Sequence, residues 1–579
     1  MKRRRFLKAM GAAAAPAIAG GALAGTAEAQ RPAASIEPRV FFYDDGRHAS
    51  GLYQFQPPLV PDDLNLAVNQ LVDSGVNTLF YSAGLEGGAV QYDSRVAAKW
   101  GENVDEWLHP IFYRASRNLH QLIADGHDPM KFLAEQCHAK GLLFMPTCPV
   151  GIQGGDKETS LGYGRKSDFV YDNPHLYVGE DDDPRAVNLG RFLGPTRMNF
   201  LQEEVRKERF LIFEELLSRY ESDGVELDLS IDNEFGPMCR FRAIDQYASA
   251  LTEWIRQLRE VARNAEAAQG RRKRIYVRVP ASTQARWKSI GYDVETWVFE
   301  KLIDGLVCIT QNKRETRTDR LVCLDQDMDI TDAVALTKGT ECRVLVGLAS
   351  SLGRQIEKIA TPPMTWAAAA MAYDRGADGF GFASGMWAPH GWPWGAEEYS
   401  TLRLLGHPDL LATADKTYFV PSQSNGPGRR GALRDGRDVL PIELAEGETI
   451  TLPIRVVDDL EKWESLGRIE SVQLWVRMTS DASSDEFDVR FNGDRLPESI
   501  RRGSDMHFRV MEDFFISPYG SAYFYTLPPK FYPKLGQNAV TVKLLKRDPK
   551  LKSARQVYDV ALSIQYMPHR NFPREPLPF

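Results

Sequence analysis

The sequence predicts an α/β protein with a (β/α)8 (TIM) barrel followed by a C-terminal all-β sandwich. Between residues 38 and 400, eight short β-branched or aromatic runs alternate with longer stretches of helical periodicity. No glycine-rich phosphate turn follows the first of these runs, which disfavours the alternative, an open doubly wound sheet. Beyond Trp394, strand-like runs replace the helical ones, which indicates the sandwich.

The barrel strands are short and regularly spaced. We expect them at 39–45, 77–83, 142–148, 224–230, 274–280, 305–311, 343–350 and 378–384. Helices are expected at 61–75, 128–141, 199–220, 244–266 and 365–376.

Two connections, Gly84–Asp125 and Pro149–Arg197, are far longer than the roughly 2–6 residues usual for such loops. Each follows a strand. We therefore expect both on the face where barrel enzymes keep their active sites.

The second half of the chain suggests an accessory domain. The barrel is predicted to span residues 38–420, a Pro/Gly/Ser-rich linker 421–431, and the sandwich 432–579. The run FNGD (491–494) is typical of a tight hairpin turn. Two roles stay open for the sandwich, since it either binds glycans or braces the barrel.

The N-terminus is typical of an export signal. A basic cluster, Lys2 to Arg5, precedes an Ala/Gly stretch that ends in Ala27-Glu28-Ala29, a pattern suited to signal peptidase. RRRFLK resembles the twin-arginine signal, with Arg3 and Arg4 as the pair. The alternatives are a Sec signal or a basic tail. We expect residues 1–29 to be a twin-arginine signal peptide and the protein to be periplasmic or secreted from a bacterium.

Charge and cysteine usage exclude several classes. Removing residues 1–29 takes away five basic residues and one acid, so the net charge falls from −7 to about −11. An acidic protein is a poor general binder of nucleic acid. The six cysteines are scattered without a CxxC pair, so no metal site is indicated, and no organic cofactor is implied. No apolar run beyond the N-terminus reaches the roughly 20 residues of a membrane span.

The strand DGVELDLSIDNE, Asp223–Glu234, carries an unusual number of carboxylates for a buried element. Because side chains alternate along a strand, Glu226, Asp228 and Ser230 are expected to face the barrel interior. A buried carboxylate costs several kcal/mol, as an order of magnitude, unless it is paired. Arg278 on the adjacent strand is the expected partner of Glu226, which makes a structural ion pair the alternative to a functional role.

Asp228 is the first candidate for catalysis, because it lies near the barrel mouth. Glycoside cleavage needs one carboxyl group to protonate the leaving oxygen and a second to attack the sugar or activate water, roughly 5–10 Å away. Glu234, on the loop beyond the strand, is the second candidate, and Glu226 is third, as a supporting group. A solvated loop acid is the alternative for Glu234.

Two stretches together resemble the family-10-like glycosyl hydrolases, which are bacterial (β/α)8 proteins. They are HDPMKFLAEQCHAKGLLFMPT and MNFLQEEVRKERFLIFEELLSRYESDGVELDLS. The shared elements, in order, are Asp128-Pro129, His138 to Gly141, Asn199, Tyr220 and Asp223-Gly224 with Asp228. The resemblance covers about residues 38–400 and implies a carbohydrate substrate.

The same strand is similar to the DG-x-D-x-D-x-E strand of chitinase-type barrels, but it departs at one position. Glu226 and Asp228 fall on the two Asp positions, whereas Ser230 replaces the proton donor. A chitinase mechanism is therefore disfavoured.

Sugar sites use aromatic platforms with polar rims. The loop SGMWAPHGWPWG gathers aromatic and histidine side chains, and we expect Trp387 above all to stack on a ligand, with packing on the barrel as the alternative. His390 suits a proton shuttle or a packing role. The other predicted substrate contacts are Asp44, Asp45, Tyr81, Arg278, Gln311 and Trp392. Asp44 and Asp45 alternatively start a turn with Gly46.

The sequence thus favours an exported glycoside hydrolase that acts by paired-carboxylate chemistry on a polysaccharide or oligosaccharide. Two rivals stay open. One is a carbohydrate-binding protein without catalysis, which the Ser230 departure supports. The other is a polysaccharide lyase, with Tyr81 or His390 as the base and Arg278 near a uronate.

Overall fold

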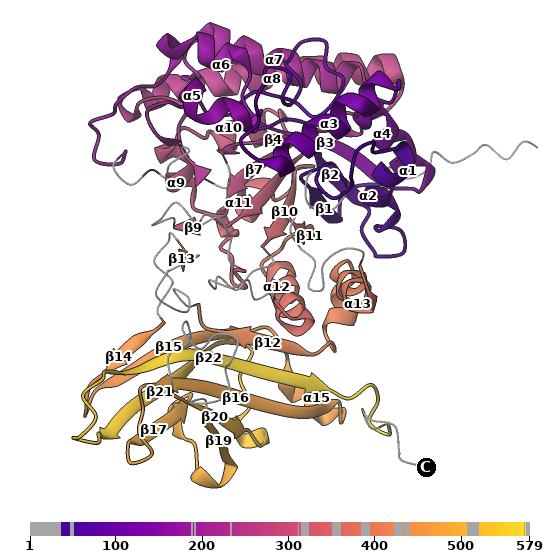
Figure 1. Ribbon diagram of the computed structural model, residues 1–579. Coiled ribbons are helices and arrows are strands. Elements are labelled where there is room, and N and C mark those ends of the chain that lie inside the picture. Colours follow the sequence, from indigo (N-terminus) through magenta and orange to yellow (C-terminus); the bar gives the residue numbers. More distant parts are fainter. Residues whose placement is uncertain are drawn as a thin grey trace, which may run out of the picture. The chain divides into compact units, whose positions relative to one another are not determined.

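A computed structural model describes the barrel and most of the C-terminal region. The described residues are 36–46, 51–186, 189, 193–231, 234–310, 312–313, 324–349, 360–383, 394–421, 432–433, 440–505, 520–572 and 574. Eight parallel strands close into a barrel in the order β1-β11-β10-β8-β7-β4-β3-β2 (Figure 1). The predicted (β/α)8 fold is confirmed.

Each barrel strand begins at its predicted start or one residue later. The strands are β1 Val40–Asp44, β2 Thr78–Ser82, β3 Leu143–Pro149, β4 Gly224–Asp228, β7 Arg274–Pro280, β8 Gly305–Ile309, β10 Arg343–Leu348 and β11 Gly379–Phe382. Two small pairings lie outside the barrel, β5 Ser230–Ile231 with β6 Glu234–Phe235, and β9 Asn312–Lys313 with β13 Ala432–Leu433.

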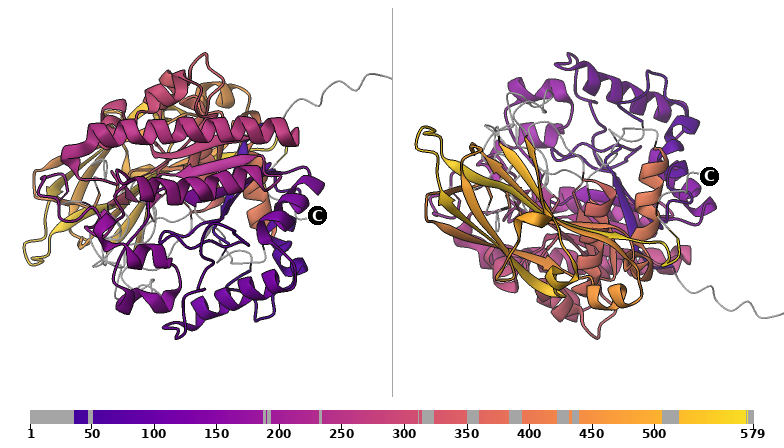
Figure 2. Two further views of the ribbon diagram at one scale, coloured as in Figure 1. Left: turned by 90° about the horizontal axis from the view of Figure 1, so that it is seen from above. Right: turned by 90° about the horizontal axis from the view of Figure 1, so that it is seen from below.

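Helices alternate with these strands along the described part of the chain. They are α1 Pro61–Leu64, α2 Leu66–Asn69, α3 Pro110–Ala124, α4 Pro129–Ala139, α5 Lys157–Ser160, α6 Asp168–Asp172, α7 Glu203–Ser218, α8 Ile244–Gln269, α9 Gln284–Ser289, α10 Val294–Phe299, α11 Thr331–Thr337, α12 Pro362–Asp374, α13 Ala396–Leu405 and α14 Pro408–Leu411. The long helices α7 and α8 pack side by side, as the view from above shows (Figure 2). None of the described helices is both long and apolar enough to cross a membrane.

One predicted helix is wrong in detail. The stretch 61–75 forms two short helices and a turn instead of one long helix. The turn has a local cause, because Asp73 adopts the left-handed φ of 60° and the Ser74 hydroxyl donates to the Leu71 carbonyl at 2.7 Å.

The two long connections carry their own helices, α3 in the first and α5 and α6 in the second. They contact each other, since Arg165 of the second pairs with Glu86 of the first and both side chains are largely buried. Because each connection follows the carboxyl end of a strand, this contact lies toward the face of the barrel that was predicted to hold the site.

The middle of the barrel is filled by aromatic rings. Phe80 packs against Phe41 and Tyr276 at centroid distances of 5.2 and 6.1 Å. Glycines make room for these rings, because a Cβ on Gly381 would lie 2.6 Å from the Phe41 ring and one on Gly305 would lie 2.2 Å from Tyr276. The interior at this level is therefore a packed core.

The described part of the C-terminal region forms two antiparallel sheets. One has the order β12-β22-β16-β20-β19 with β14 paired to β22, and the other has the order β15-β21-β17-β18. Their apolar faces share a buried cluster that includes Leu474, Val542 and Leu562. The predicted sandwich is confirmed. Its elements are β12 Lys416–Phe419, β14 Ile442–Leu444, β15 Thr449–Val456, α15 Leu460–Ser465, β16 Ile469–Thr479, β17 Glu486–Phe491, β18 Asp494–Arg495, β19 Arg501–Asp505, β20 Ser521–Thr526, β21 Gly536–Lys546 and β22 Arg555–Tyr566.

The FNGD run forms the predicted hairpin turn. Phe491 pairs with Asp494, and Asn492 and Gly493 between them have φ values of 52° and 92°. Two positive φ angles in a two-residue loop match the right-handed twist of the flanking strands.

Strand β12 joins the barrel segment to the sandwich. It pairs with β22, and Gln326 of the barrel segment donates to the Thr417 carbonyl at 2.7 Å. Lys416 is buried and pairs with Asp458 at 2.7 Å, and the same carboxylate accepts hydrogen bonds from Tyr418 and Tyr566.

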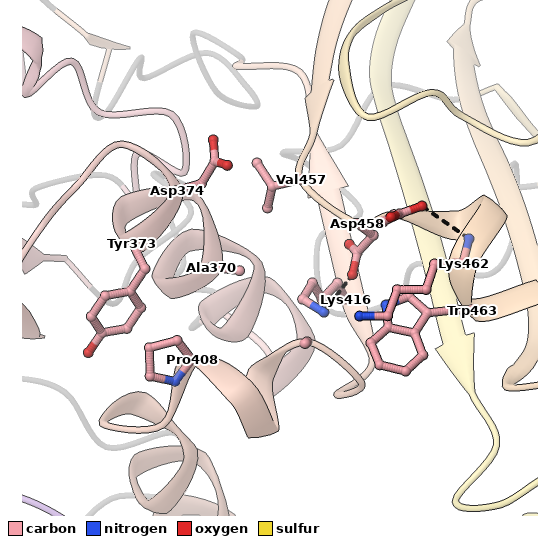
Figure 3. A pocket seen from close by; sticks show the side chains of 11 residues that line it. Ala370, Tyr373, Asp374, Pro408, Lys416, Val457, Asp458, Lys462 and Trp463 are labelled. Carbon is pink, nitrogen blue, oxygen red and sulfur yellow. Dashed lines mark hydrogen bonds and ion pairs between the residues drawn. The ribbon is translucent and has the colours of Figure 1, made fainter. Parts of the chain in front are cut away.

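A pocket of about 370 Å³ lies beside this ion pair, lined in part by Tyr373, Pro408, Lys416, Asp458 and Trp463 (Figure 3). None of its lining residues belongs to the predicted catalytic or substrate-binding set. The pocket therefore marks the junction with the sandwich, where the buried Lys416–Asp458 pair is central.

Replacing Lys416 with Met is expected to destabilise the protein by about 3–5 kcal/mol, because it leaves the Asp458 carboxylate buried without its cation. Urea unfolding followed by fluorescence measures the change. Lys462→Met, at an exposed lysine nearby, is the control and should leave the unfolding midpoint within error. An equal midpoint for Lys416→Met and wild type would show that the pair does not hold this junction.

Candidate functional site

The predicted partner of Glu226 is Arg278, and the two form a bidentate ion pair inside the barrel. Arg278 Nε and Nη2 donate to Oε1 and Oε2 of Glu226 at 3.0 and 2.8 Å. Thr147 on β3 donates its hydroxyl to Oε2 at 2.7 Å, and the guanidinium lies over the Tyr43 ring at 4.5 Å. Four strands thus converge on one buried charge pair.

Burial disfavours the charged forms of both Glu226 and Arg278, and the geometry of their two hydrogen bonds compensates for this cost. Glu226 is fully buried, and burial raises the pKa of its carboxyl group against the opposing effect of Arg278. Burial also disfavours the charged guanidinium, but the Glu226 and Asp228 carboxylates outweigh it and raise the pKa of Arg278. Two hydrogen bonds from one planar fork give the geometry in which a buried pair is tolerated.

Asp228 lies at the carboxyl end of β4, next to this pair. Its Oδ1 accepts hydrogen bonds from the backbone N–H of Ser230 at 2.8 Å and from the Ser230 hydroxyl at 2.6 Å. Its Oδ2 lies 3.6 Å from Nη1 of Arg278. The residue retains 7% exposure, whereas Glu226 has none. The carboxylate is therefore held in one orientation at the end of the strand where barrel enzymes act.

Ser230 thus has a specific role in the structure. It occupies the position of the chitinase proton donor, and it orients the Asp228 carboxylate with two hydrogen bonds. Strand β4 ends at Asp228, and Ser230 begins the short strand β5.

Glu234 follows on β6, opposite Ile231 in the β5–β6 pairing. Its side chain is fully buried, not solvated as a loop acid would be. Asp232 and Asn233, which join the two short strands, lie outside the described residues.

The end of β1 holds two further predicted residues. Asp44 is buried, and its Oδ1 accepts the Gly46 N–H at 2.8 Å, where Gly46 has a φ of 71°. Asp44 therefore starts a turn with Gly46. Asp45 is buried beside it, and its carbonyl accepts a hydrogen bond from Gln91.

Tyr81 is buried on β2, next in sequence to the inward-facing Phe80, so its ring points away from the barrel interior. Its hydroxyl packs closely against the turn at Gly46, where a Cβ would lie only 2.8 Å away. In this position Tyr81 shapes the end of β1.

Most of the predicted aromatic platform lies outside the described residues. This holds for Trp387, His390 and Trp392, and also for Gln311 at the end of β8. Trp394, the last tryptophan of that loop, is described and packs on Phe42 and Tyr399 at 5.1 and 6.1 Å. Trp394 thus takes the packing role.

The residues that carry the family resemblance pair with one another. Tyr220 donates to the Asp128 carboxylate at 2.6 Å, and Asp128 also caps α4 by accepting from the Met130 N–H. His138 lies 2.8 Å from Asp223, which also accepts the Phe144 N–H. These contacts join α4 to the segment after α7 and to the starts of β3 and β4, so these members of the motif belong to the scaffold, whereas Asp228 lies at the barrel mouth.

The sequence interpretation missed Thr147 and Tyr43, which complete the surroundings of the ion pair. Their positions on β3 and β1 were predicted, but their contact with Arg278 and Glu226 depends on strand register, which periodicity alone does not give. Within the described ranges, no group of three His, Cys, Asp or Glu side chains is placed to hold a metal ion. The five described cysteines are buried and unpaired.

Neither a family model nor a curated protein matches this sequence. Among solved structures, the chain is similar to the glycoside hydrolase domain of PgaB (BpsB) from Bordetella bronchiseptica, at 12% identity and a TM-score of 0.38, over 64% of this chain and 99% of that one. It is also similar to an alpha-L-fucosidase (isoenzyme 2) from Paenibacillus thiaminolyticus, at 11% identity and a TM-score of 0.39, over 71% and 52%.

A third similar structure is the alpha-galactosidase AgaA from Geobacillus stearothermophilus, at 10% identity and a TM-score of 0.35, over 88% of this chain and 56% of that one. This chain therefore spans only about half the length of the fucosidase and the galactosidase. All three are glycoside hydrolases by name.

Replacing Arg278 with Met is expected to cost about 3–5 kcal/mol at pH 8, because Glu226 stays buried without its cation. Without Arg278 the folded pKa of Glu226 rises further above its ordinary 4.5, so the fold favours the protonated form. The variant should therefore be relatively stable near pH 5 and lose stability as the pH rises.

Urea unfolding of wild type and Arg278→Met between pH 5 and pH 8 measures this effect. The double variant Arg278→Met/Glu226→Gln should lose most of the added pH dependence, and Arg263→Met, at an exposed arginine on α8, should match wild type. A loss of stability in Arg278→Met that does not change with pH would contradict the assignment to Glu226.

Proposed function

We propose that the protein is an exported glycoside hydrolase in which Asp228 is the principal catalytic carboxylate. One observation carries the proposal, the oriented carboxylate of Asp228 at the carboxyl end of β4. Two hydrogen bonds from Ser230 and the nearby Arg278 guanidinium fix its direction. A carboxylate fixed in this way costs no reorganisation when positive charge develops on a sugar ring.

The chemistry assigns a separate role to each acid. One carboxyl group protonates the leaving oxygen, the glycosidic bond breaks, and a carboxylate attacks the anomeric carbon or takes a proton from the attacking water. Asp228, whose Oδ1 already accepts two hydrogen bonds, suits the anionic role. Glu234, which follows it across the β5–β6 pairing, is the proposed proton donor. Glu226 touches Arg278 instead of the mouth, so it is a positioning residue.

Substrate binding in this proposal draws on the mouth of the barrel. Trp387 and Trp392 would stack on sugar faces, and Gln311 and His390 would contact hydroxyl groups. Asp44, Asp45, Tyr81 and Arg278 would act from behind these residues, because all four are buried.

One alternative has a specific observation in its favour. Glu234 is fully buried and Asp228 nearly so, which would suit a carbohydrate-binding protein without hydrolysis. A binder would retain glycan and release no new reducing end. A lyase would release an unsaturated sugar that absorbs in the ultraviolet.

Asp228→Asn is expected to lower kcat for glycan hydrolysis by about 10³-fold or more, because it removes the charge that stabilises the transition state. Reducing-end release from a glycan panel measures the change. The control is Asp245→Asn, at an exposed acid at the start of α8, which should retain wild-type activity and the same melting temperature. Equal turnover by Asp228→Asn and wild type would remove Asp228 from the mechanism.

Replacing both Arg3 and Arg4 with Lys is expected to retain the protein in the cytoplasm, because the twin-arginine pathway reads that pair. Cell fractionation and immunoblotting measure the distribution. A Lys2→Arg variant, which leaves the pair intact, serves as the control. Normal export of the double-lysine protein would favour a Sec signal.

A further inference from the structure

A second buried arginine lies outside the predicted catalytic set. Arg209, on α7, has no exposed surface. Its Nη1 lies 3.4 Å from both the Cys148 Sγ and the Pro149 carbonyl, at the end of β3. In the part of the chain that the structure describes, its Nε and Nη2 have no hydrogen-bond partner, and no carboxylate lies within ion-pair distance of the guanidinium.

Two other buried arginines, by contrast, have partners for their guanidinium donors. Arg278 has the bidentate Glu226. Arg197 pairs with none of the described carboxylates, but its three nitrogens donate to four backbone carbonyls, including those of Pro237 and Cys239. An arginine stays charged at any physiological pH, so a buried guanidinium with two unused donors is costly.

The Cys148 thiol is the side chain that comes closest to a counter-ion for Arg209, but it is not an anion. Burial raises the pKa of the Cys148 thiol, and the lowering by Arg209 does not reverse the shift. Cys148 is therefore a neutral thiol at physiological pH and does not balance the charge of Arg209.

A second unpartnered donor faces the same place. The Ser167 hydroxyl is buried and has no hydrogen-bond partner within the described ranges. Ser167 and Arg209 meet beside Gly88, where a Cβ would lie 2.7 Å from Ser167 Oγ and 3.5 Å from Arg209 Nη2. Gly88 has a φ of 98° and carries only a hydrogen there, so both donor atoms lie close to the same side of one glycine.

We propose that Arg209 and Ser167 bind a small monovalent anion of the halide class in this interior site beside Gly88. Two donors of a buried guanidinium and a buried hydroxyl, all without partners among the described residues, match an anion better than a water molecule. Because the ligand must lie against the backbone of Gly88, in the space that its missing side chain leaves, it must be a small ion.

The site lies directly behind the proposed catalytic strand. Arg209 contacts the Pro149 carbonyl, Pro149 is in register with Asp228, and the Val150 N–H donates to the Asp228 carbonyl at 2.8 Å. The bound ion holds the carboxyl end of β3 in place and so supports the backbone that carries Asp228. Stability reports this binding whether or not the protein is a hydrolase.

The test compares melting temperatures in chloride, bromide and gluconate at one ionic strength, after dialysis into halide-free buffer. Wild type should melt a few degrees higher in either halide, with a rise that saturates with concentration. Arg209→Gln should lose this halide-specific rise. Lys207→Gln, which removes an exposed positive charge from the same helix, should keep it.

Two further measurements keep the proposal falsifiable if Arg209→Gln fails to fold. Ser167→Ala should weaken the halide effect, so that the rise in melting temperature reaches its midpoint at a halide concentration at least several-fold higher than in wild type. Crystals grown in bromide should show an anomalous peak beside Arg209 and Ser167. Equal wild-type melting temperatures in halide and gluconate, or a bromide crystal without that peak, would overturn the proposal and leave an ordered water as the occupant.

Discussion

The Glu226–Arg278 ion pair is the interaction on which the rest of the barrel interior depends. It is buried where an uncompensated charge would cost several kcal/mol, so both partners must be held in place. Thr147 and Tyr43 complete that enclosure from two more strands. The register of β1, β3, β4 and β7 is therefore linked to one charge pair, with packed aromatic rings below it and Asp228 at its outer side.

This arrangement separates support from chemistry along the strands. Near the start of β4, His138–Asp223 joins α4 to that strand, and Asp128–Tyr220 joins the start of α4 to the segment after α7. In the middle, Phe41, Phe80 and Tyr276 fill the barrel. At the carboxyl end, Asp228 keeps a small exposed area and two ordered donors. A (β/α)8 barrel can change its substrate by changing its loops because these lower layers stay the same.

Much of this was accessible from the sequence, for physical reasons. Strand positions follow from apolar runs, and the inward direction of Glu226 and its pairing with Arg278 follow from alternation along neighbouring strands. The hairpin at Asn492–Gly493 follows from its turn residues. The break after α2 was missed because it depends on one Asp in a left-handed conformation, which no periodicity reveals.

The site was harder to predict than the fold. Thr147 and Tyr43 contact the ion pair through strand register. The two Arg209 donors that lack partners among the described residues are buried only because α7 brings this side chain to the end of β3. The motif that carries the family resemblance predicted the order of the elements along the chain. Apart from Asp228, however, its residues make contacts within the scaffold and not at the barrel mouth. Motif spacing identifies which elements meet, whereas the direction of each side chain is fixed by packing.

The central claim is that a fixed carboxylate at the end of β4 cleaves glycosidic bonds with water. The most direct measurement is mass spectrometry of the products formed from a glycan panel in water enriched in oxygen-18. The account predicts shortened glycans that carry one oxygen-18 atom at the new reducing end, formed by wild type and not by Asp228→Asn. Unsaturated products without the label, or equal labelling by both proteins, would contradict it.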